Sequence, residues 1–301
     1  MATNNNKLGA ARYDLQFKEI LQAVFQHRAY FGDFFGGGIE AIDGVKENET
    51  AFYVKTSDIP VVVGTYDTDE NTAFGTGTAN STRFGERTEV IYENTPAEYT
   101  WNYAIHEGID RFTVNNDFER AIADRLELQA QAKVNQFNAH HGKFISDNAG
   151  EDIDGTEGDV ADLFNKLSAH FINEQTIGTK VAKVNTEVYN QIMDHPLTTT
   201  AKSSRTDIDR GDVPMFKGFE IDVTPDALFE DGETVYAYIV GVGKAFTGIN
   251  TVRTIESEDF DGVALQAAGL AGEFILDDNK VAVVKVTGAP SKGGDNGDET
   301  P

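Results

Sequence analysis

The stretch from residue 116 to residue 145 constrains the fold of this 301-residue chain more than any other. Apolar and aromatic side chains recur there at steps of three or four residues, which places them on one face of an α-helix. These positions are Phe118, Ile122, Leu126, Ala130, Val134, Phe137, His141 and Phe144. Asn116 or Asp117 can cap the N-terminus, and Gly142 is expected to end or bend the helix. The pattern predicts a helix of roughly 40 Å against which other layers pack.

The composition excludes several classes of protein. Acidic residues outnumber basic ones 50 to 25, so the formal charge is −25, and such a surface repels nucleic acid and anionic membranes. Cysteine is absent, which excludes disulfides and thiolate sites and fits a reducing compartment. The N-terminus lacks the apolar core of a signal peptide, and no apolar run reaches the ~20 residues of a membrane helix. We expect no membrane partner, and one elaborate domain or two.

A second helix is predicted from Asp14, after a mobile polar segment at 1–12, and it ends before the glycines at 36–38. Its apolar side is formed by Phe17, Ile20, Leu21, Val24 and Phe31. Two interpretations stay open. This helix is either part of the core or an arm that packs on a neighbouring subunit.

Residues 45–114 predict a long β-hairpin. The expected strands are 51–56 and 59–63 on the outgoing side and 88–92 and 98–105 on the return. In the last strand Tyr99, Trp101, Tyr103 and Ile105 alternate with small or polar residues, which predicts one covered and one wet face. The tip at 64–87 is rich in Gly, Thr and Asn and cannot bury enough surface to order itself. Cover from another molecule is therefore expected.

The C-terminal half predicts a compact α/β region after an acidic surface loop at 147–162. Helices are expected at 160–172 and 186–195, with a polar loop at 196–212. The expected strands are 179–185, 216–224, 234–243, 251–258, 263–269 and 280–286. The Gly- and Asp-rich tail is expected to be disordered.

No motif indicates a nucleotide site, a serine nucleophile or a histidine metal site. The Gly-x-Gly runs at 75–77 and 241–243 lack the rest of a dinucleotide fingerprint, and no Ser lies in a nucleophile elbow. His140 and His141 are adjacent and would point about 100° apart on a helix. His170 and His195 lack metal-ligand spacing. Surface or core histidines are the simpler interpretation.

Acidic loops give only partial calcium patterns. Asp207, Asp209 and Asp212 form one and Asp152 with Asp154 another, but neither completes the loop, because position twelve counted from Asp207 is Gly218. Solvated acidic loops are the simpler interpretation. The adhesion-type tripeptide at 210–212 is short enough to recur by chance. Paired carboxylates for glycoside chemistry need only proximity in space, so fifty acids carry no information about them.

The order of these parts resembles the major capsid proteins of tailed bacteriophages, an α+β, Hong Kong 97-like fold. The resemblance spans residues 8–287. Its matching pieces are the polar hairpin 64–87 (the family's E-loop), the spine helix 116–145 of the P-domain, the A-domain segments 180–195 and 215–226, and the closing strands 255–286.

The resemblance implies a division of the chain into six parts. They are an N-terminal arm and helix (1–44), the E-loop hairpin (45–105), the P-domain with its spine helix (106–150), the A-domain (151–250), closing strands shared by both domains (251–289) and a disordered tail (290–301).

The resemblance also implies a structural role without enzyme activity. Hexamers and pentamers would tile an icosahedral shell around double-stranded DNA that is bound without sequence specificity. The hairpin and the N-terminal arm would cross onto neighbouring subunits, and the A-domain would lie at the capsomer centre. Scaffolding, portal and decoration proteins are the implied partners, and the virion, assembled in the bacterial cytoplasm, is the implied location. No catalytic, cofactor-binding or metal-binding residue is predicted.

Some phages of this family join subunits by a Lys–Asn isopeptide bond from a lysine in the E-loop. The tip at 64–87 has no lysine, and Lys46 and Lys55 lie near the base of the hairpin. A non-covalent shell is therefore expected. Arg83 and Arg87 either pair with acids on a neighbour or are solvated charges near a turn. Only a short sequence precedes the arm helix, which favours a separate scaffolding protein or none.

Three alternatives remain open. The same fold builds encapsulin nanocompartments, which enclose enzymes, and the contents of purified shells would distinguish them. A monomeric carboxylate-dependent hydrolase would be a stable monomer with a deep acidic cleft. A secreted calcium-binding adhesin would melt in a calcium-dependent manner, but the chain lacks a signal peptide.

Overall fold

The structure is a computed structural model. It describes residues 28–41, 50–57, 59–69, 72–73, 82–114, 118–199 and 213–290. Several sequence predictions lie outside these residues: the segment 1–12, the helix from Asp14 up to residue 27, the caps Asn116 and Asp117, most of the loop 196–212 and the tail from residue 291.

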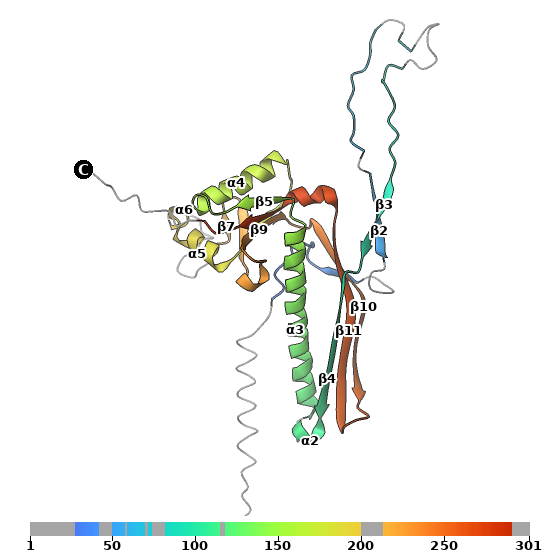
Figure 1. Cartoon of the computed structure of the whole chain (residues 1–301), viewed down its shortest axis with the longest axis vertical. Coiled ribbons are helices and arrows are strands. Elements are labelled where there is room, and N and C mark those ends of the chain that lie inside the picture. The colour runs from blue at the N-terminus through green and yellow to red at the C-terminus, as the bar shows by residue number, and fades with distance from the viewer. Residues whose placement is uncertain are drawn as a thin grey trace, which may run out of the picture.

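Three β-sheets and a long helix form the described structure (Figure 1). A four-stranded sheet has the order β1 (Ile39–Ala41), β10 (Gly243–Glu256), β11 (Gly262–Ile275), β4 (Trp101–Asp110). A six-stranded sheet has the order β5 (Glu151–Asp154), β12 (Val283–Thr287), β9 (Glu233–Ile239), β6 (Lys180–Val184), β8 (Phe219–Val223), β7 (Met215–Phe216). The third sheet is the pair β2 (Thr50–Thr56) and β3 (Glu93–Glu98). The helices are α2 (Arg111–Val114), α3 (Phe118–Asp147), α4 (Val160–Asn173), α5 (Thr186–Asp194) and α6 (Pro196–Thr199), with 3₁₀ turns η1 (Asp226–Leu228) and η2 (Asp277–Ala282).

The predicted long helix is confirmed as α3, which runs beside the four-stranded sheet in Figure 1. Its predicted apolar stripe is only partly covered. Phe137 and His141 are buried, whereas Ala130 is exposed and Gln129 is buried in its place. The compact part of the molecule packs only against the C-terminal half of α3, so a regular stripe in the sequence does not give uniform burial.

Gly142 neither ends nor bends α3, which continues to Asp147. It is a packing position instead. A Cβ at Gly142 would lie 2.4 Å from the carbonyl oxygen of Leu228, a distance no side chain tolerates. The glycine therefore lets the turn η1 approach the helix backbone.

The alternation predicted around Trp101 is confirmed. Tyr99, Trp101 and Tyr103 are buried and their neighbours in sequence are exposed. The ring of Trp101 packs edge-on against Phe137 of α3 at 4.8 Å between centroids. Period-two patterning thus identifies the face of β4 that the spine helix covers.

The six-stranded sheet and helices α4 and α5 form the compact end of the molecule (Figure 1). Leu163, Phe164, Leu167 and Phe171 of α4 are fully buried against this sheet. Helix α4 begins with a capping box, in which Asp159 accepts from the backbone of Asp162 and the side chain of Asp162 accepts in return. The predicted helices 160–172 and 186–195 are confirmed.

Several predicted strands differ in the structure. The strand expected at 216–224 is broken into β7 and β8, because Lys217 and Gly218 adopt positive φ and form a tight turn. The strand expected at 280–286 starts later, because η2 occupies 277–282. Strands β10 and β11 are 14 residues each, longer than their apolar runs indicated, since each connects the compact end to the far end of the long sheet.

The predicted strands at 59–63 and 88–92 are wrong as strands. Both segments are described without regular secondary structure, and no described residue pairs with them across the hairpin. Their β-branched residues fit a strand, but a strand needs a hydrogen-bonded neighbour. Within the described parts of the chain, no helix is long and apolar enough to cross a membrane.

Candidate assembly interface

The most unusual surface of the molecule is the arm, defined as the described residues 50–57, 59–69, 72–73 and 82–98. Only its base is a β-sheet, and the rest projects away from the body in Figure 1. The projecting part exposes apolar side chains on both sides of the hairpin. They are Val61 (91% exposed), Val62 (76%), Val63 (90%), Tyr66, Phe84 (81%), Val90, Ile91 and Tyr92.

The base of the arm is held firmly to the body. Phe52 of β2 packs edge-on against Phe246 and Phe274 at 5.2 and 5.9 Å. Thr56 and Thr95 share a hydrogen bond of 2.7 Å across β2 and β3. The exposed part therefore extends from a base that is packed on the body.

The described part of the arm tip is organised by Arg83. Its guanidinium donates hydrogen bonds to the carbonyl oxygens of Thr72 and Asp67 at 3.2 Å and of Asp69 at 3.4 Å. Tyr66 and Phe84 pack edge-on at 5.1 Å, and the backbone of Asp67 donates to Arg83 at 2.9 Å. Of the two alternatives left open for Arg83, a pairing with acids on a neighbour or a solvated charge, the structure shows neither, because its donors are engaged within its own hairpin. Arg87 is exposed.

An aromatic residue is also exposed at the opposite end of the molecule. Phe112 of α2 is 84% exposed, at the far end of the long sheet in Figure 1. Beside it Arg111 pairs with Asp261 at 3.1 Å and with Glu256 at 3.7 Å, which ties α2 to the ends of β10 and β11. Phe112 is thus an exposed aromatic side chain on a helix that ion pairs fix to the long sheet.

Inside the body, a buried lysine connects the first described loop to the six-stranded sheet. The ammonium of Lys183, whose side chain is 2% exposed, lies 2.6 Å from Asp222 and 3.0 Å from Asp33. Asp33 also accepts from the hydroxyl of Tyr238 at 2.8 Å, and Arg28 donates to Asp222 at 3.0 Å. Burial, reinforced by the charge of Asp33, raises the pKa of Tyr238. The cluster has a structural role: its charges are paired with one another, and these pairs hold the loop at Asp33 to the six-stranded sheet.

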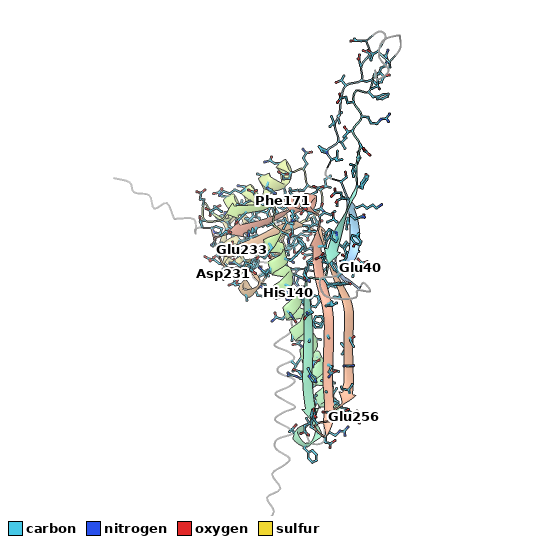
Figure 2. The ribbon with its side chains drawn as sticks, turned by 45° about the vertical axis from the view of Figure 1, so that its right-hand side comes forward. Glu40, His140, Phe171, Asp231, Glu233 and Glu256 are labelled. Atoms are coloured by element: carbon cyan, nitrogen blue, oxygen red, sulfur yellow. The ribbon has the colours of Figure 1, made fainter. Side chains whose placement is uncertain are left out.

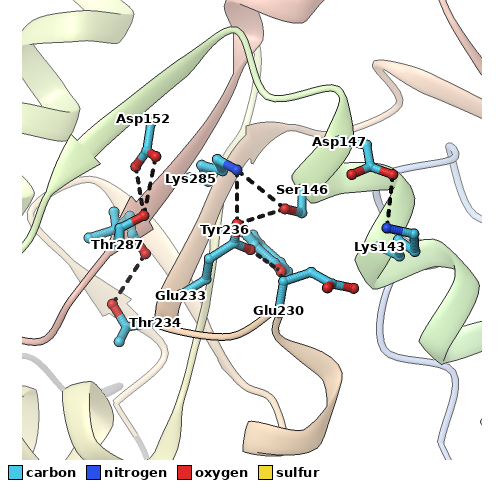
Figure 3. A network of polar contacts seen from close by, with 11 residues as sticks. Lys143, Ser146, Asp147, Asp152, Glu230, Glu233, Thr234, Tyr236, Lys285 and Thr287 are labelled. Atoms are coloured by element: carbon cyan, nitrogen blue, oxygen red, sulfur yellow. Dashed lines mark hydrogen bonds and ion pairs between the residues drawn. The ribbon is translucent and has the colours of Figure 1, made fainter.

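A second polar cluster joins the end of α3 to the six-stranded sheet (Figure 3). Lys285 of β12 lies 2.9 Å from Glu233, which accepts from Ser146 of α3 at 2.7 Å and from Tyr236. Burial pushes the pKa of Glu233 upward, but the hydrogen bonds from Tyr236, Ser146 and Lys285 outweigh it and leave the pKa below its usual value. The hydrogen bond to Glu233 raises the pKa of Lys285. The spine helix is thus fixed to the compact end.

A buried carboxylate lies where α3 crosses the long sheet. Glu273 accepts from the indole nitrogen of Trp101 at 3.1 Å and lies 3.6 Å from the Nε2 atom of His141, which has no hydrogen-bond partner among the described residues. Burial raises the pKa of Glu273. Burial, followed by the charge of His140, lowers the pKa of His141 to about 3. His140 stacks on Trp101 at 3.9 Å. Both histidines are packing residues of the core.

The remaining sequence motifs do not converge on a chemical site. Asp152 accepts from the Thr287 hydroxyl, and Asp154 accepts from the backbone and hydroxyl of Thr156. Gly241 occupies the turn between β9 and β10 with φ of 79°. Asp207, Asp209, the tripeptide 210–212 and the glycines at 75 and 77 lie outside the described residues. Among the residues that are described, no group of three or more His, Asp or Glu side chains could hold a metal ion.

No protein-family model and no curated protein matches this sequence. Solved structures do match it over most of their length. The capsid of the cyanophage P-SCSP1u matches with a TM-score of 0.65 at 9% identity, over 89% of this chain and 90% of that chain. The mature capsid of bacteriophage PhiM1 matches with a TM-score of 0.63 at 10% identity, over 87% and 88%. A virus-like particle from Pyrococcus furiosus matches with a TM-score of 0.50 at 15% identity, over 89% and 95%.

The chain therefore has the α+β fold of tailed-phage capsid proteins, as the sequence resemblance predicted. The Hong Kong 97-like layout accounts for its parts: a long sheet with a spine helix, a compact sheet with helices on it, and a projecting hairpin. The hairpin was predicted from the sequence, and cover of its tip by another molecule stays a prediction. Sequence reasoning did not find that the apolar runs at 61–63 and 90–92 are themselves the exposed surface, although their β-branched residues beside a polar tip were the available signal.

Proposed function

We propose that this chain is the major capsid protein of a tailed bacteriophage. Copies of it assemble as hexamers and pentamers into an icosahedral shell that encloses double-stranded DNA. The capsid fold supports this proposal. The role is structural, and the chain has no catalytic residue in this proposal.

The exposed arm is the observation that carries the proposal. Val61 and Val63 are about nine-tenths exposed, and fully burying one such side chain stabilises by about 1.5–3 kcal/mol. A monomer gains nothing from presenting these residues on a rigid extension. A neighbouring copy that covers these residues buries apolar surface on both sides of the hairpin. The same contact can repeat around a ring of copies.

Each part of the fold has a role in this proposal. The hairpin (45–105) lies over a neighbouring subunit, and the P-domain (106–150) with the closing strands (251–289) forms the wall of the shell. The A-domain (151–250) lies at the capsomer centre, and the N-terminal arm (1–44) crosses to a neighbour.

The proposed partners follow from the shell. Packaged DNA is held without sequence readout, because a chain with a formal charge of −25 repels phosphate rather than binding it. Portal and scaffolding proteins, and a decoration protein, are further partners. The proposed location is the virion, with assembly in the bacterial cytoplasm.

A nanocompartment of the encapsulin type is the second candidate, supported by the match to the virus-like particle from Pyrococcus furiosus. The phage capsids named above match with higher TM-scores, which favours the phage role. The contents of particles from producing cells separate the two. Nuclease-protected double-stranded DNA supports a phage capsid, and an enclosed enzyme supports a nanocompartment.

Shortening the arm tests the proposed function. Residues 57–92 are replaced by a two-residue turn that joins β2 to β3, and the full chain is the control. We expect the full chain to sediment as closed shells. The shortened chain should keep the circular dichroism and thermal unfolding of the body but form no shells. A shortened chain that assembles like the full chain would contradict the proposal.

A further inference from the structure

The long sheet has an edge that no described strand covers. Strand β10 pairs with β11 along its length from Gly243 to Glu256. On its other side β1 pairs with only Ala245, Phe246 and Thr247. Among the described residues, none pairs with the outer edge of 251–256. In an antiparallel strand alternate residues point their N–H and C=O groups away from the partner, so within the described part of the chain this edge has hydrogen-bonding groups that no strand pairs with.

This edge has the properties of a strand that accepts another. Its six residues, Thr251 to Glu256, include β-branched Thr251, Val252, Thr254 and Ile255 and no proline. Val252 is 62% exposed and Ile255 39% exposed. Soluble proteins cover or charge such edges, because an open edge templates pairing with another chain.

The arm contains a segment that also lacks a strand partner among the described residues. Residues 87–92, with the sequence RTEVIY, are extended, exposed and unpaired with any described residue. Every residue in this segment has a backbone N–H, whereas the opposite side of the hairpin contains Pro60, which has none. The segment is also rich in β-branched and aromatic side chains, and Glu89 offers a charge opposite to that of Arg253.

The two surfaces of one chain point in opposite directions. Figures 1 and 2 place the arm at one end of the molecule and Glu256, the last residue of β10, at the other end. The base of the arm is packed on the body through Phe52, and the arm projects away from the long sheet (Figure 1). Pairing between arm and edge therefore takes place between copies, and it is a head-to-tail contact that closes into rings.

We propose that residues 87–92 of one copy pair as an added β-strand with the edge 251–256 of a neighbouring copy. This inference rests on the proposed shell and names the contact that holds neighbours together. Main-chain hydrogen bonds would provide the attraction. Arg253 would favour the register in which it faces Glu89, because opposite charges facing each other stabilise a sheet and like charges destabilise it.

Disulfide scanning tests the pairing directly, because the natural chain has no cysteine. Val252→Cys is combined in turn with Thr88→Cys, Glu89→Cys, Val90→Cys, Ile91→Cys and Tyr92→Cys, all at exposed positions. Assembled particles are oxidised and separated on non-reducing denaturing gels. Each single-cysteine variant is the matched control. In a strand pair, only cysteines on the same face as residue 252 can reach it.

The expected result is an alternating pattern. Ladders of covalent multimers should form with positions of one parity, 88, 90 and 92 or 89 and 91, and at least tenfold less with the other parity. The single variants should give no ladder. Shells that form normally but show no ladder, or ladders of equal strength at all five positions, would overturn the strand pairing and leave the proposed function standing. Failure of the unmodified chain to form any shell would instead count against the proposed function.

Discussion

The exposed valines of the arm allow the assembly energy to be tested without disturbing the fold. Val61 and Val63 are 91% and 90% exposed, and in an extended segment they point to the same side. Replacing both with serine removes apolar surface that only a neighbour can cover. If that neighbour covers both, the lost burial is about 3–6 kcal/mol for each copy, an upper bound since serine retains part of the contact.

The assay is the critical concentration for assembly, measured by light scattering and sedimentation. A loss of about 3 kcal/mol corresponds to roughly a hundredfold change in an equilibrium constant, so the critical concentration of V61S/V63S should rise by about that factor. The free energy of unfolding of the unassembled chain should stay within about 0.5 kcal/mol of the natural value. Val62→Ser, on the other side of the segment, is the matched control. Equal critical concentrations for V61S/V63S and the natural chain would refute the reasoning.

Four further predictions concern the body and the shell. His141→Gln should lessen the fall in the free energy of unfolding on acidification, because the lowered pKa of His141 makes its contribution disappear between about pH 6.5 and pH 3. The free energy of unfolding of Glu273→Gln should differ from that of the natural chain more at pH 7 than at pH 4, because a raised carboxyl pKa costs stability as pH rises above 4.5. Denaturant titrations measure both variants, and free energies that change with pH in parallel with the natural chain would contradict these two predictions. Lys183→Met should cost about 3 kcal/mol, at the low end for a broken buried pair since the two carboxylates are partly exposed, whereas Arg28→Met, with a 64% exposed side chain, should cost under about 1 kcal/mol. Shells boiled in detergent should run as a single band at 32.9 kDa; a ladder would show covalent joining.

The sequence predicted the elements whose signals are local. The spacing from Phe118 to Phe144 predicts α3, and the alternation from Tyr99 to Ile105 predicts the buried face of β4. Both patterns arise because one side of an element faces a layer of its own chain. The capsid layout followed from the order of such elements.

The features that the sequence did not predict depend on contacts between residues that are far apart in the chain. The apolar runs at 61–63 and 90–92 have the residues of strands, but within the described chain nothing pairs with them. Gly142 was expected to end the helix because glycine disfavours helices, whereas the close approach of Leu228 explains it. For Arg83 the sequence left open a pairing with a neighbour or a solvated charge, because its engagement with Thr72 and Asp67 depends on the fold of the tip. Each difference concerns a tertiary contact that composition and spacing do not encode.

A reconstruction of the assembled protein by electron cryomicroscopy tests the central claim most directly. We predict closed shells of pentamers and hexamers in which the arm residues 59–69 and 82–92 of each copy lie against a neighbouring copy. A stable monomer at high concentration, with and without the proteins that accompany it in the producing cell, and with the arm packed against its own body, would contradict the account.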